Sequence, residues 1–509
     1  MPENKSRTVA KNTLFLYLRM IVTLVISLYT SRVVLHNLGI SDFGLYNVVG
    51  GFITIFSFIN NSMAQATQRF ITYSLGEGDK YKTMAIFSQS FYIHALIGLV
   101  ILFVSESVGL WYFYNYLVIE PGREFAAMVI YQISVVVTMI NILIVPFRAM
   151  IVAYEKMSTF AYITIFEVAM KLVIAIVLSI CIFDKLIVYG ILMTIVTIVT
   201  ALCFFIYSKR KFETCKFIRI HDKKTIREMT SFASWSMLGS LAAAGYGQGL
   251  NLVINAFFGT TVNAARGISV QIQSIVRGFA SNFQLALNPQ ITKSYASNDK
   301  EYFFSLIYKG SLFSFFLFYF VAFPVFMEID KFLEIWLVEV PLHSDNFVRL
   351  MLAISCVEVL ASPLNVGIQA SGRVKVLETT VSIILLLILP VSYVSLKIVE
   401  MPEIVFIINL LFVLVAQLAR MVIAQSIFSL SIRKYCKNVL VPIIFVILTS
   451  SLVPVFLKYI LPNTIANAFL VICVSFLSCF VSIFYVGLGR NDRSKLIAFA
   501  LSKLHCNKL

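Results

Sequence analysis

Charged residues are scarce in this chain, and the signatures of several chemistries are missing. Only 13% of the 509 residues are charged, whereas 59% are hydrophobic. The sequence contains no Walker motif, zinc-ligand cluster or serine triad, so we expect no cofactor and no ATP-driven transport by this chain alone. The glycine-rich string at 245–249 lies in an apolar stretch with no strand before it, which excludes a phosphate-cradling nucleotide loop.

The cysteines form no recognisable pattern either. No CxxC pair or regular spacing occurs, so the sequence predicts neither disulfides nor a metal site. The eight cysteines are Cys181, Cys203, Cys215, Cys356, Cys436, Cys473, Cys479 and Cys506.

Long apolar stretches are what the chain has in abundance. They recur from end to end at the length of about 20 residues that a spanning helix needs. We therefore expect an all-α polytopic membrane protein of about 14 transmembrane helices. The fourteen candidate spans are centred near residues 24, 54, 95, 136, 171, 197, 244, 275, 316, 357, 385, 416, 450 and 477.

The positions of the lysines and arginines predict the orientation. If the amino terminus is cytoplasmic, most of the 41 basic residues fall in cytoplasmic loops and termini, so both termini are expected in the cytoplasm. The net charge of +16 is then mainly a topology signal, with contact to membrane lipids expected and nucleic-acid binding not expected. The longest cytoplasmic connection carries Lys209, Arg210, Lys211, Lys216, Arg219, Lys223, Lys224 and Arg227.

Two segments 220 residues apart resemble each other. Residues 69–80 match residues 289–300 at five of twelve positions, after the second and eighth spans. This predicts two six-helix parallel repeats that form two lobes around a central cavity, plus two extra C-terminal helices. The expected domains are an N-terminal lobe at 1–208, a basic cytoplasmic linker at 209–228, a C-terminal lobe at 229–430, and two further helices with a basic tail at 431–509.

One span carries an unusual polar stripe. Along residues 263–288, five polar side chains recur at steps of seven, four, seven and four, which places them within about 60° of one helical face. They are Arg266, Gln273, Arg277, Gln284 and Asn288. An arginine at the centre of a bilayer costs on the order of 3 kcal/mol, so the stripe predicts a cavity that accepts water or an anion.

Three other spans carry polar stripes, and together with the eighth span they form two repeat-related pairs. The stripe residues include Arg19 on the first span, Asn61 and Gln65 on the second, and Gln248, Asn251 and Asn255 on the seventh. Polar residues of this kind also serve as interhelical hydrogen-bond contacts worth about 1 kcal/mol each. Arg32, near the outer end of the first span, either contacts substrate or extends to the interface.

The charges within the spans are mostly positive, which favours an anionic substrate over an organic cation. Eight basic residues, Arg19, Arg32, Lys171, Arg266, Arg277, Lys309, Arg349 and Arg420, oppose Glu167, Glu358 and Glu378.

The acidic residues in the spans are candidates for ion or proton coupling. Glu167 and Lys171 are one helical turn apart and can form a neutral pair, so a structural role competes with a coupling role. Glu358 has no partner nearby in sequence and is the main coupling candidate, unless it pairs across helices with Arg420 or another arginine.

Residues 11–79 resemble the start of bacterial polysaccharide-export flippases in the multidrug/oligosaccharidyl-lipid/polysaccharide (MOP) exporter superfamily. The likeness rests on the arginine at the end of the first span, the polar end of the second span, and a turn of the form LG-x-x-x-[FY]G-[LI]Y. The turn residues are Leu38, Gly39, Phe43, Gly44, Leu45 and Tyr46.

The resemblance implies a flippase that moves an undecaprenyl-pyrophosphate-linked oligosaccharide to the outer leaflet of a bacterial inner membrane, for surface polysaccharide biosynthesis. Arg19, Arg266 and Arg277 would attract the pyrophosphate. Transient contact with a polysaccharide polymerase or with glycosyltransferases belongs to the same prediction. Hydrogen bonds to sugars would come from Asn61, Gln65, Gln248, Asn251, Asn255, Gln273 and Gln284.

Two alternatives remain open. A multidrug exporter of the same fold would be expected to carry acidic cation sites, against which the basic excess argues. A polysaccharide polymerase or ligase would need a substantial external region, whereas the longest external stretches, near 106–124 and 328–346, have only about 19 residues each.

Overall fold

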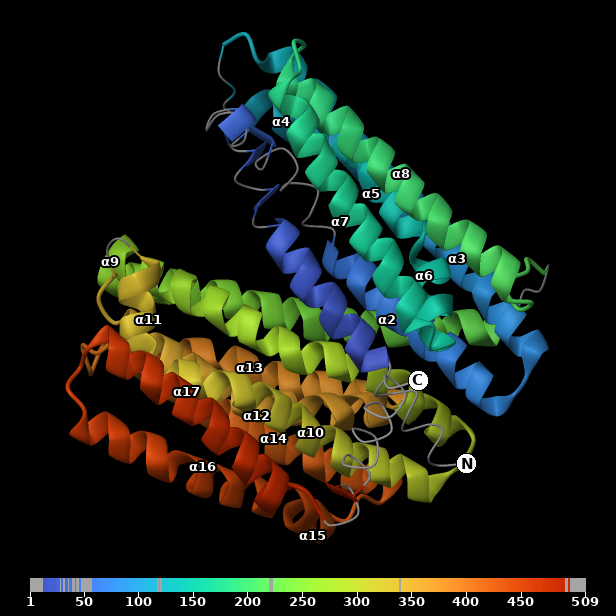
Figure 1. Cartoon of the computed structure of the whole chain (residues 1–509). Coiled ribbons are helices and arrows are strands. Elements are labelled where there is room, and N and C mark those ends of the chain that lie inside the picture. The colour runs from blue at the N-terminus through green and yellow to red at the C-terminus, as the bar shows by residue number, and fades with distance from the viewer. Residues whose placement is uncertain are drawn as a thin grey trace, which may run out of the picture. The chain divides into compact units, whose positions relative to one another are not determined.

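The computed structural model is helical throughout most of the chain (Figure 1). It describes residues 12–27, 29–30, 33–34, 36–38, 42, 45–46, 57–116, 119, 121–218, 223–337, 340–489 and 493–494. Within these ranges the side chains of residues 57–61, 248, 255, 259–261 and 263–264 lie outside the description. The described residues contain no β-strand.

The chain divides into two compact units. Unit 1 comprises Met1–Leu241 and Leu285–Lys300, and unit 2 comprises Ala242–Gln284 and Glu301–Leu509. The predicted lobes follow the sequence repeat, whereas these units follow packing, so the predicted domain boundaries stay a prediction.

Unit 1 is built from helices that mostly have the length of a membrane span. The first is Asn12–Ser27. It is followed by α2 (Ser57–Glu77), α3 (Lys80–Val104), a π-helical turn (Ser105–Gly109), α4 (Leu110–Tyr116), α5 (Glu124–Leu143), α6 (Val145–Ala153), α7 (Met157–Ser179) and α8 (Lys185–Lys211). Asp79 and Asp184 cap α3 and α8 by accepting hydrogen bonds from Lys82 N and from Leu186 N and Ile187 N.

Unit 2 holds nearly all of α10 (Lys300–Met327) and the elements that follow it. These are α11 (Ile329–Trp336), α12 (Ser344–Ala370), α13 (Val374–Leu396), α14 (Ile404–Phe428), α15 (Ile432–Tyr435), a π-helical turn (Cys436–Leu440), α16 (Val441–Ile460), α17 (Ile465–Ser482) and a last π-helical turn (Ile483–Gly487).

The two units are joined by α9 (Lys223–Ala296), which is 74 residues long and enters unit 2 at Ala242 before returning at Leu285. Arg266 contacts Asn251, 15 residues earlier in the chain. In a straight helix 15 residues span about 22 Å, so the chain must reverse between these two residues. The seventh and eighth predicted spans are thus two arms of α9.

The described helices confirm a polytopic membrane protein. Ten of them are long and apolar enough to cross a membrane, and each covers one of the fourteen predicted centres. The other four centres belong to the first, second, seventh and eighth spans. The first two are only partly described, and α9 does not reach the same apolar composition, in keeping with its predicted polar stripes.

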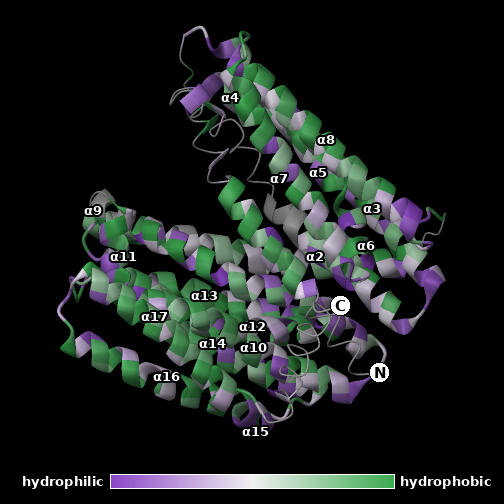
Figure 2. Cartoon of the chain, viewed as in Figure 1, coloured by the Kyte–Doolittle hydropathy of each residue, from purple (hydrophilic) through white to green (hydrophobic). Residues whose placement is uncertain are grey.

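Many large apolar side chains lie on the helix surfaces, as a lipid environment requires. On α16, for example, Ile444, Phe445, Leu448 and Leu452 are all more than half exposed. Figure 2 shows the same apolar character along α16 and α17, with hydrophilic residues gathered near several helix ends.

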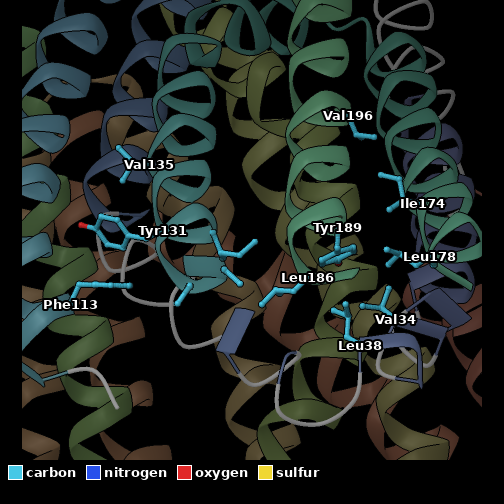
Figure 3. Packing of buried hydrophobic residues seen from close by; sticks show 14 residues of the cluster. Val34, Leu38, Phe113, Tyr131, Val135, Ile174, Leu178, Leu186, Tyr189 and Val196 are labelled. Carbon is cyan, nitrogen blue, oxygen red and sulfur yellow. The ribbon is translucent and has the colours of Figure 1, made fainter. Parts of the chain in front are cut away.

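Each unit has its own apolar core. In unit 1, Tyr131, Leu178 and Leu186 belong to a buried cluster drawn from α5, α7 and α8 (Figure 3). In unit 2, Leu250, Phe347 and Phe406 belong to a cluster that joins α9, α12 and α14.

The backbone supports the predicted internal repeat. Gly78 and Asn298, which are 220 residues apart, both adopt positive φ angles, of 79° and 55°, within two residues of the ends of α2 and α9. The amide of each donates to the carbonyl three residues before it, at 3.2 Å and 3.1 Å. A left-handed residue ends many helices in this way, so the two related segments end their helices alike.

Repeat-related residues also touch. A Cβ atom added to Gly76 would lie 2.7 Å from the Cβ of Ala296, its partner at the 220-residue offset. Only glycine at position 76 permits this approach of α2 to the end of α9 within unit 1.

Candidate functional site

The polar stripe of α9 lies largely within unit 2, and its first member holds the two arms of the helix together. Arg266 donates from Nη1 to Asn251 Oδ1 and from Nη2 to the carbonyl of Gly247, the latter at 2.9 Å. Its side chain is buried, and its Nε has no hydrogen-bond partner among the described residues. Two predicted substrate ligands, Arg266 and Asn251, therefore bind each other.

Two glutamines of the stripe attach α9 to α12. Gln273 Nε2 donates to Ser355 Oγ at 2.6 Å, and Gln284 Nε2 donates to the carbonyl of Val359 at 3.0 Å. Interhelical bonds of this kind contribute about 1 kcal/mol each in membrane proteins. The stripe thus forms a helix-packing seam, and binding of sugars by these two glutamines stays a prediction.

Arg277 lies between the two glutamines and forms an ion pair with α12. Its Nη1 donates to Glu358 Oε2 at 2.7 Å, so Glu358 pairs with an arginine outside its own helix. The side chains of Arg277 and Glu358 are 43% and 26% exposed, which leaves Arg277 the more accessible partner.

A second guanidinium, from α14, belongs to the same group of charges. Arg420 interacts electrostatically with Glu358 and with Glu378 of α13, and it is repelled by Arg277. Its Nε is buried without a hydrogen-bond partner in the described part of the chain. We call Arg277, Glu358, Glu378 and Arg420 the unit 2 charge cluster. From the sequence, Arg420 is expected in a span and is a possible partner of Glu358. It is not among the predicted substrate ligands.

Two membrane cations in the described part of unit 1, Arg19 and Lys171, lie against an aromatic ring or pair along one helix. Arg19 lies over the ring of Phe160, 5.2 Å from its centre. Lys171 Nζ donates to Glu167 Oε1 at 2.7 Å, which is the local pair that the sequence predicts. Whether Glu167, Lys171 or Glu358 couples transport to an ion stays a prediction.

The remaining predicted site residues are described only in part. Gln65 is exposed on α2. Arg32 lies outside the described residues, as do the side chains of Asn61, Gln248 and Asn255.

The described residues contain no group of three or more His, Cys, Asp or Glu side chains that could hold a metal ion. The seven cysteines that the structure describes are free thiols.

Each unit has a charged cluster near the start of one helix, in which an arginine binds two aspartates. We call these two clusters the clasps. In unit 1, Arg123 at the start of α5 donates to Asp42 and Asp184, and in unit 2 Arg349 near the start of α12 donates to Asp345 and Asp330. Burial pushes the pKa of Asp184 upward, but its hydrogen bonds with Arg123 and with backbone amides outweigh that effect and hold the pKa below its usual range.

Glu403, before α14, is held in a comparable way. Its Oε1 accepts hydrogen bonds from His343 at 2.6 Å and from Asn346 at 3.1 Å. Burial raises the pKa of Glu403, and these two hydrogen bonds more than offset it, so the pKa lies below the usual range.

Comparison with known proteins gives the class of fold. No protein-family model matches the chain, and no curated protein matches it in sequence. Among solved structures, it is similar to a MATE transporter in the bent conformation, with a TM-score of 0.70 and 12% identity over 82% of this chain and 96% of that one. An outward-facing multidrug resistance MATE family transporter of the MOP superfamily gives a TM-score of 0.70 and 13% identity over 83% and 95%.

The MATE transporter ClbM in complex with Rb+ is also similar, with a TM-score of 0.67 and 16% identity over 84% of this chain and 97% of that one. Identities this low establish the fold and not the substrate. The chain is a multi-pass helical membrane protein with the fold of the MATE transporters, and these neighbours are transporters rather than enzymes.

Proposed function

We propose that the protein is a secondary transporter that flips an undecaprenyl-pyrophosphate-linked oligosaccharide across the bacterial inner membrane by alternating access. Such a flippase supplies lipid-linked glycan for surface polysaccharide, and its two termini would lie in the cytoplasm. The fold supports transport of some kind. The choice of substrate rests on the charges within the spans and on the resemblance of residues 11–79 to polysaccharide-export flippases.

The observation that carries the proposal is the accessibility of Arg277. Its guanidinium is 43% exposed, and Nη1 is its one hydrogen-bond donor with an acceptor among the described residues. An arginine has five N–H donors arranged for bidentate binding of phosphate, so most of its capacity is available. Arg19 supplies a second cation, from the first helix of unit 1.

A reconstituted translocation assay tests the proposal. Liposomes that contain purified protein and fluorescent undecaprenyl-pyrophosphate oligosaccharide should move the lipid between leaflets. The double variant R19A/R277A should insert normally and lose at least about tenfold in rate, because the two guanidinium–phosphate contacts together contribute more than about 1.4 kcal/mol.

The matched control is R433A/K434A, which removes two cations from the short helix α15 and should transport at the normal rate. Normal surface-glycan assembly in cells that carry R19A/R277A would contradict the assignment of these two arginines. A deletion strain that accumulates no lipid-linked glycan would contradict the function itself.

The energy source follows from the class of transporter. We propose that the membrane potential or a cation gradient drives the cycle, with Glu358, or the pair Glu167–Lys171, as the coupling group. Translocation that persists after collapse of both gradients in the liposomes would contradict this coupling.

A multidrug exporter is the second candidate, because one structural neighbour is a multidrug resistance transporter. An exporter of organic cations should accumulate or extrude a cationic dye in the same liposomes, and we expect no dye transport. The leaflet assay also separates a flippase from a polymerase or ligase, which would lengthen or transfer the glycan without moving the lipid.

A further inference from the structure

We propose that Glu358 is an internal counter-anion: an incoming phosphate or pyrophosphate displaces its carboxylate from Arg277 and is bound by Arg277 and Arg420 together. This inference rests on the proposed function and names the residues at which the substrate's anionic group would bind. It makes Glu358 a competitor of the substrate, and it adds Arg420 to the site.

The geometry of the pair leaves room for exchange. A single bond of 2.7 Å joins Nη1 of Arg277 to Glu358, although a carboxylate and a guanidinium can form two parallel bonds. The pair therefore uses part of the available attraction. A phosphate group, with three or more acceptor oxygens and a higher charge, can engage the same guanidinium more fully.

The surroundings contain a second cation without a complete set of partners. The charge of Arg420 is attracted by Glu358 and by Glu378 and is repelled by Arg277. The Nε of Arg420 is buried and lacks an acceptor in the part of the chain that the structure describes. Glu358 and Glu378 supply one negative charge each against the two guanidiniums. A group with two or more negative charges in the place of the Glu358 carboxylate would attract Arg277 and Arg420 more strongly than that carboxylate does.

Opening the ion pair would not separate the helices. Gln273 binds α12 four residues before Arg277, and Gln284 binds it seven residues after. These two neutral attachments hold α9 against α12 on both sides of the pair. The ion pair can therefore exchange partners while the seam remains closed.

Two other ion pairs have a different construction. Lys171 and Glu167 lie on one helix, so the helix itself keeps them together. Lys293 binds Glu155, whose side chain is 9% exposed and also accepts a bond from Gln290. Of these three pairs, Arg277–Glu358 has the most exposed cation, at 43% against 32% and 26%.

Binding of soluble anions to the full-length protein in lipid nanodiscs tests the inference without any transport. The probes are inorganic pyrophosphate and farnesyl pyrophosphate, measured by isothermal titration calorimetry at fixed ionic strength. E358Q should bind both about tenfold more tightly than the unmodified chain, because the competing carboxylate is gone. R277Q and R420Q should each bind at least about tenfold more weakly.

The matched control is D345N, which removes one carboxylate from the same helix and should leave the affinity unchanged. Asp345 is 13 positions from Glu358, or about 20 Å along α12. If E358Q does not fold, E358D serves instead: its shorter side chain weakens the pair and should tighten anion binding by a smaller factor. Unchanged or weaker binding in the folded Glu358 variant would overturn the inference, as would unchanged binding in R420Q.

The two probes separate the sources of the anion. Tighter binding of farnesyl pyrophosphate than of inorganic pyrophosphate favours a lipid headgroup, and equal binding favours a free anion. Tighter anion binding by E358Q in a protein that flips no lipid-linked glycan would remove the proposed function and keep this inference. If the protein flips the glycan but E358Q binds the anions no more tightly, the proposed function would stand and this inference would be overturned.

Discussion

The two units bind their arginines in a similar way near helix starts but use different partners for arginines in the interior. Arg123 and Arg349 stand at the starts of α5 and α12, and each is held by two aspartates. Inside unit 1, Arg19 and Arg148 lie over aromatic rings. Inside unit 2, arginines form polar contacts across helices or between the arms of α9. The two units thus share a similar charged arrangement at these helix starts, and the ion pair of Arg277 with Glu358 joins two helices of unit 2.

The largest expected effect on stability compares an interior arginine that donates hydrogen bonds with one that lies over an aromatic ring. Arg266→Met should lower the free energy of unfolding by about 3 kcal/mol, because it leaves Asn251 and the carbonyl of Gly247 without their charged donor. Arg148→Met should cost only about 1 kcal/mol, since Arg148 lies over the Phe204 ring at 5.0 Å. Thermal unfolding in detergent measures both, and equal losses would remove the contrast.

A second prediction compares two glycines. Gly76→Ala in unit 1 should destabilise by about 1–3 kcal/mol, because the new Cβ would lie 2.7 Å from Ala296 Cβ and 2.9 Å from backbone atoms of Lys293. Gly267→Ala in unit 2 meets no atom within 4 Å. It should stabilise its helix by about 0.5–1 kcal/mol. A Gly76→Ala protein that melts at the normal temperature would contradict the close approach.

The smallest effect concerns the clasp in unit 1. The pKa of Asp184 is lower in the folded state than in the unfolded chain, so its stabilisation is present above the ordinary aspartate pKa. It is lost as the pH falls through the lower, folded-state pKa. Asp184→Asn should therefore cost at most about 1 kcal/mol near neutrality and progressively less in acid.

Melting temperatures of both proteins from pH 7 to pH 3 measure this effect. A difference that grows as the pH falls would have the wrong sign. Glu403→Gln, at the related position before α14, should follow the same direction because the pKa of Glu403 is also lowered.

Much of the fold could be predicted because lipid imposes a strong length and composition rule on spanning helices. In the part of the chain that the structure describes, each of the ten helices that are long and apolar enough to cross a membrane covers a predicted centre. The repeat was visible in residues 69–80 and 289–300, and the positive φ of Gly78 and Asn298 gives it a physical basis. The two arms of α9 correspond to the seventh and eighth predicted spans. The hydrogen bonds of Arg266 with Asn251 and Gly247, which join the arms, were not predicted, because periodicity locates apolar segments and says little about how two of them pack.

The site was less predictable. The spacing of the stripe on α9 correctly placed Gln273, Arg277 and Gln284 on one face, since helical geometry fixes that relation. It did not indicate that this face meets α12, because a polar stripe is compatible with either a cavity or a packing seam. The pairing of Arg277 with Glu358 joins residues 81 positions apart, and no local pattern encodes it.

The contact of Gly76 with Ala296 has a consequence for how the chain can change over time. Positions 76 and 296 are counterparts in the repeat, and they also lie against each other within unit 1. A larger side chain at either position would be opposed by the residue at the other. The two positions must therefore change together, because they share the space of little more than one methyl group.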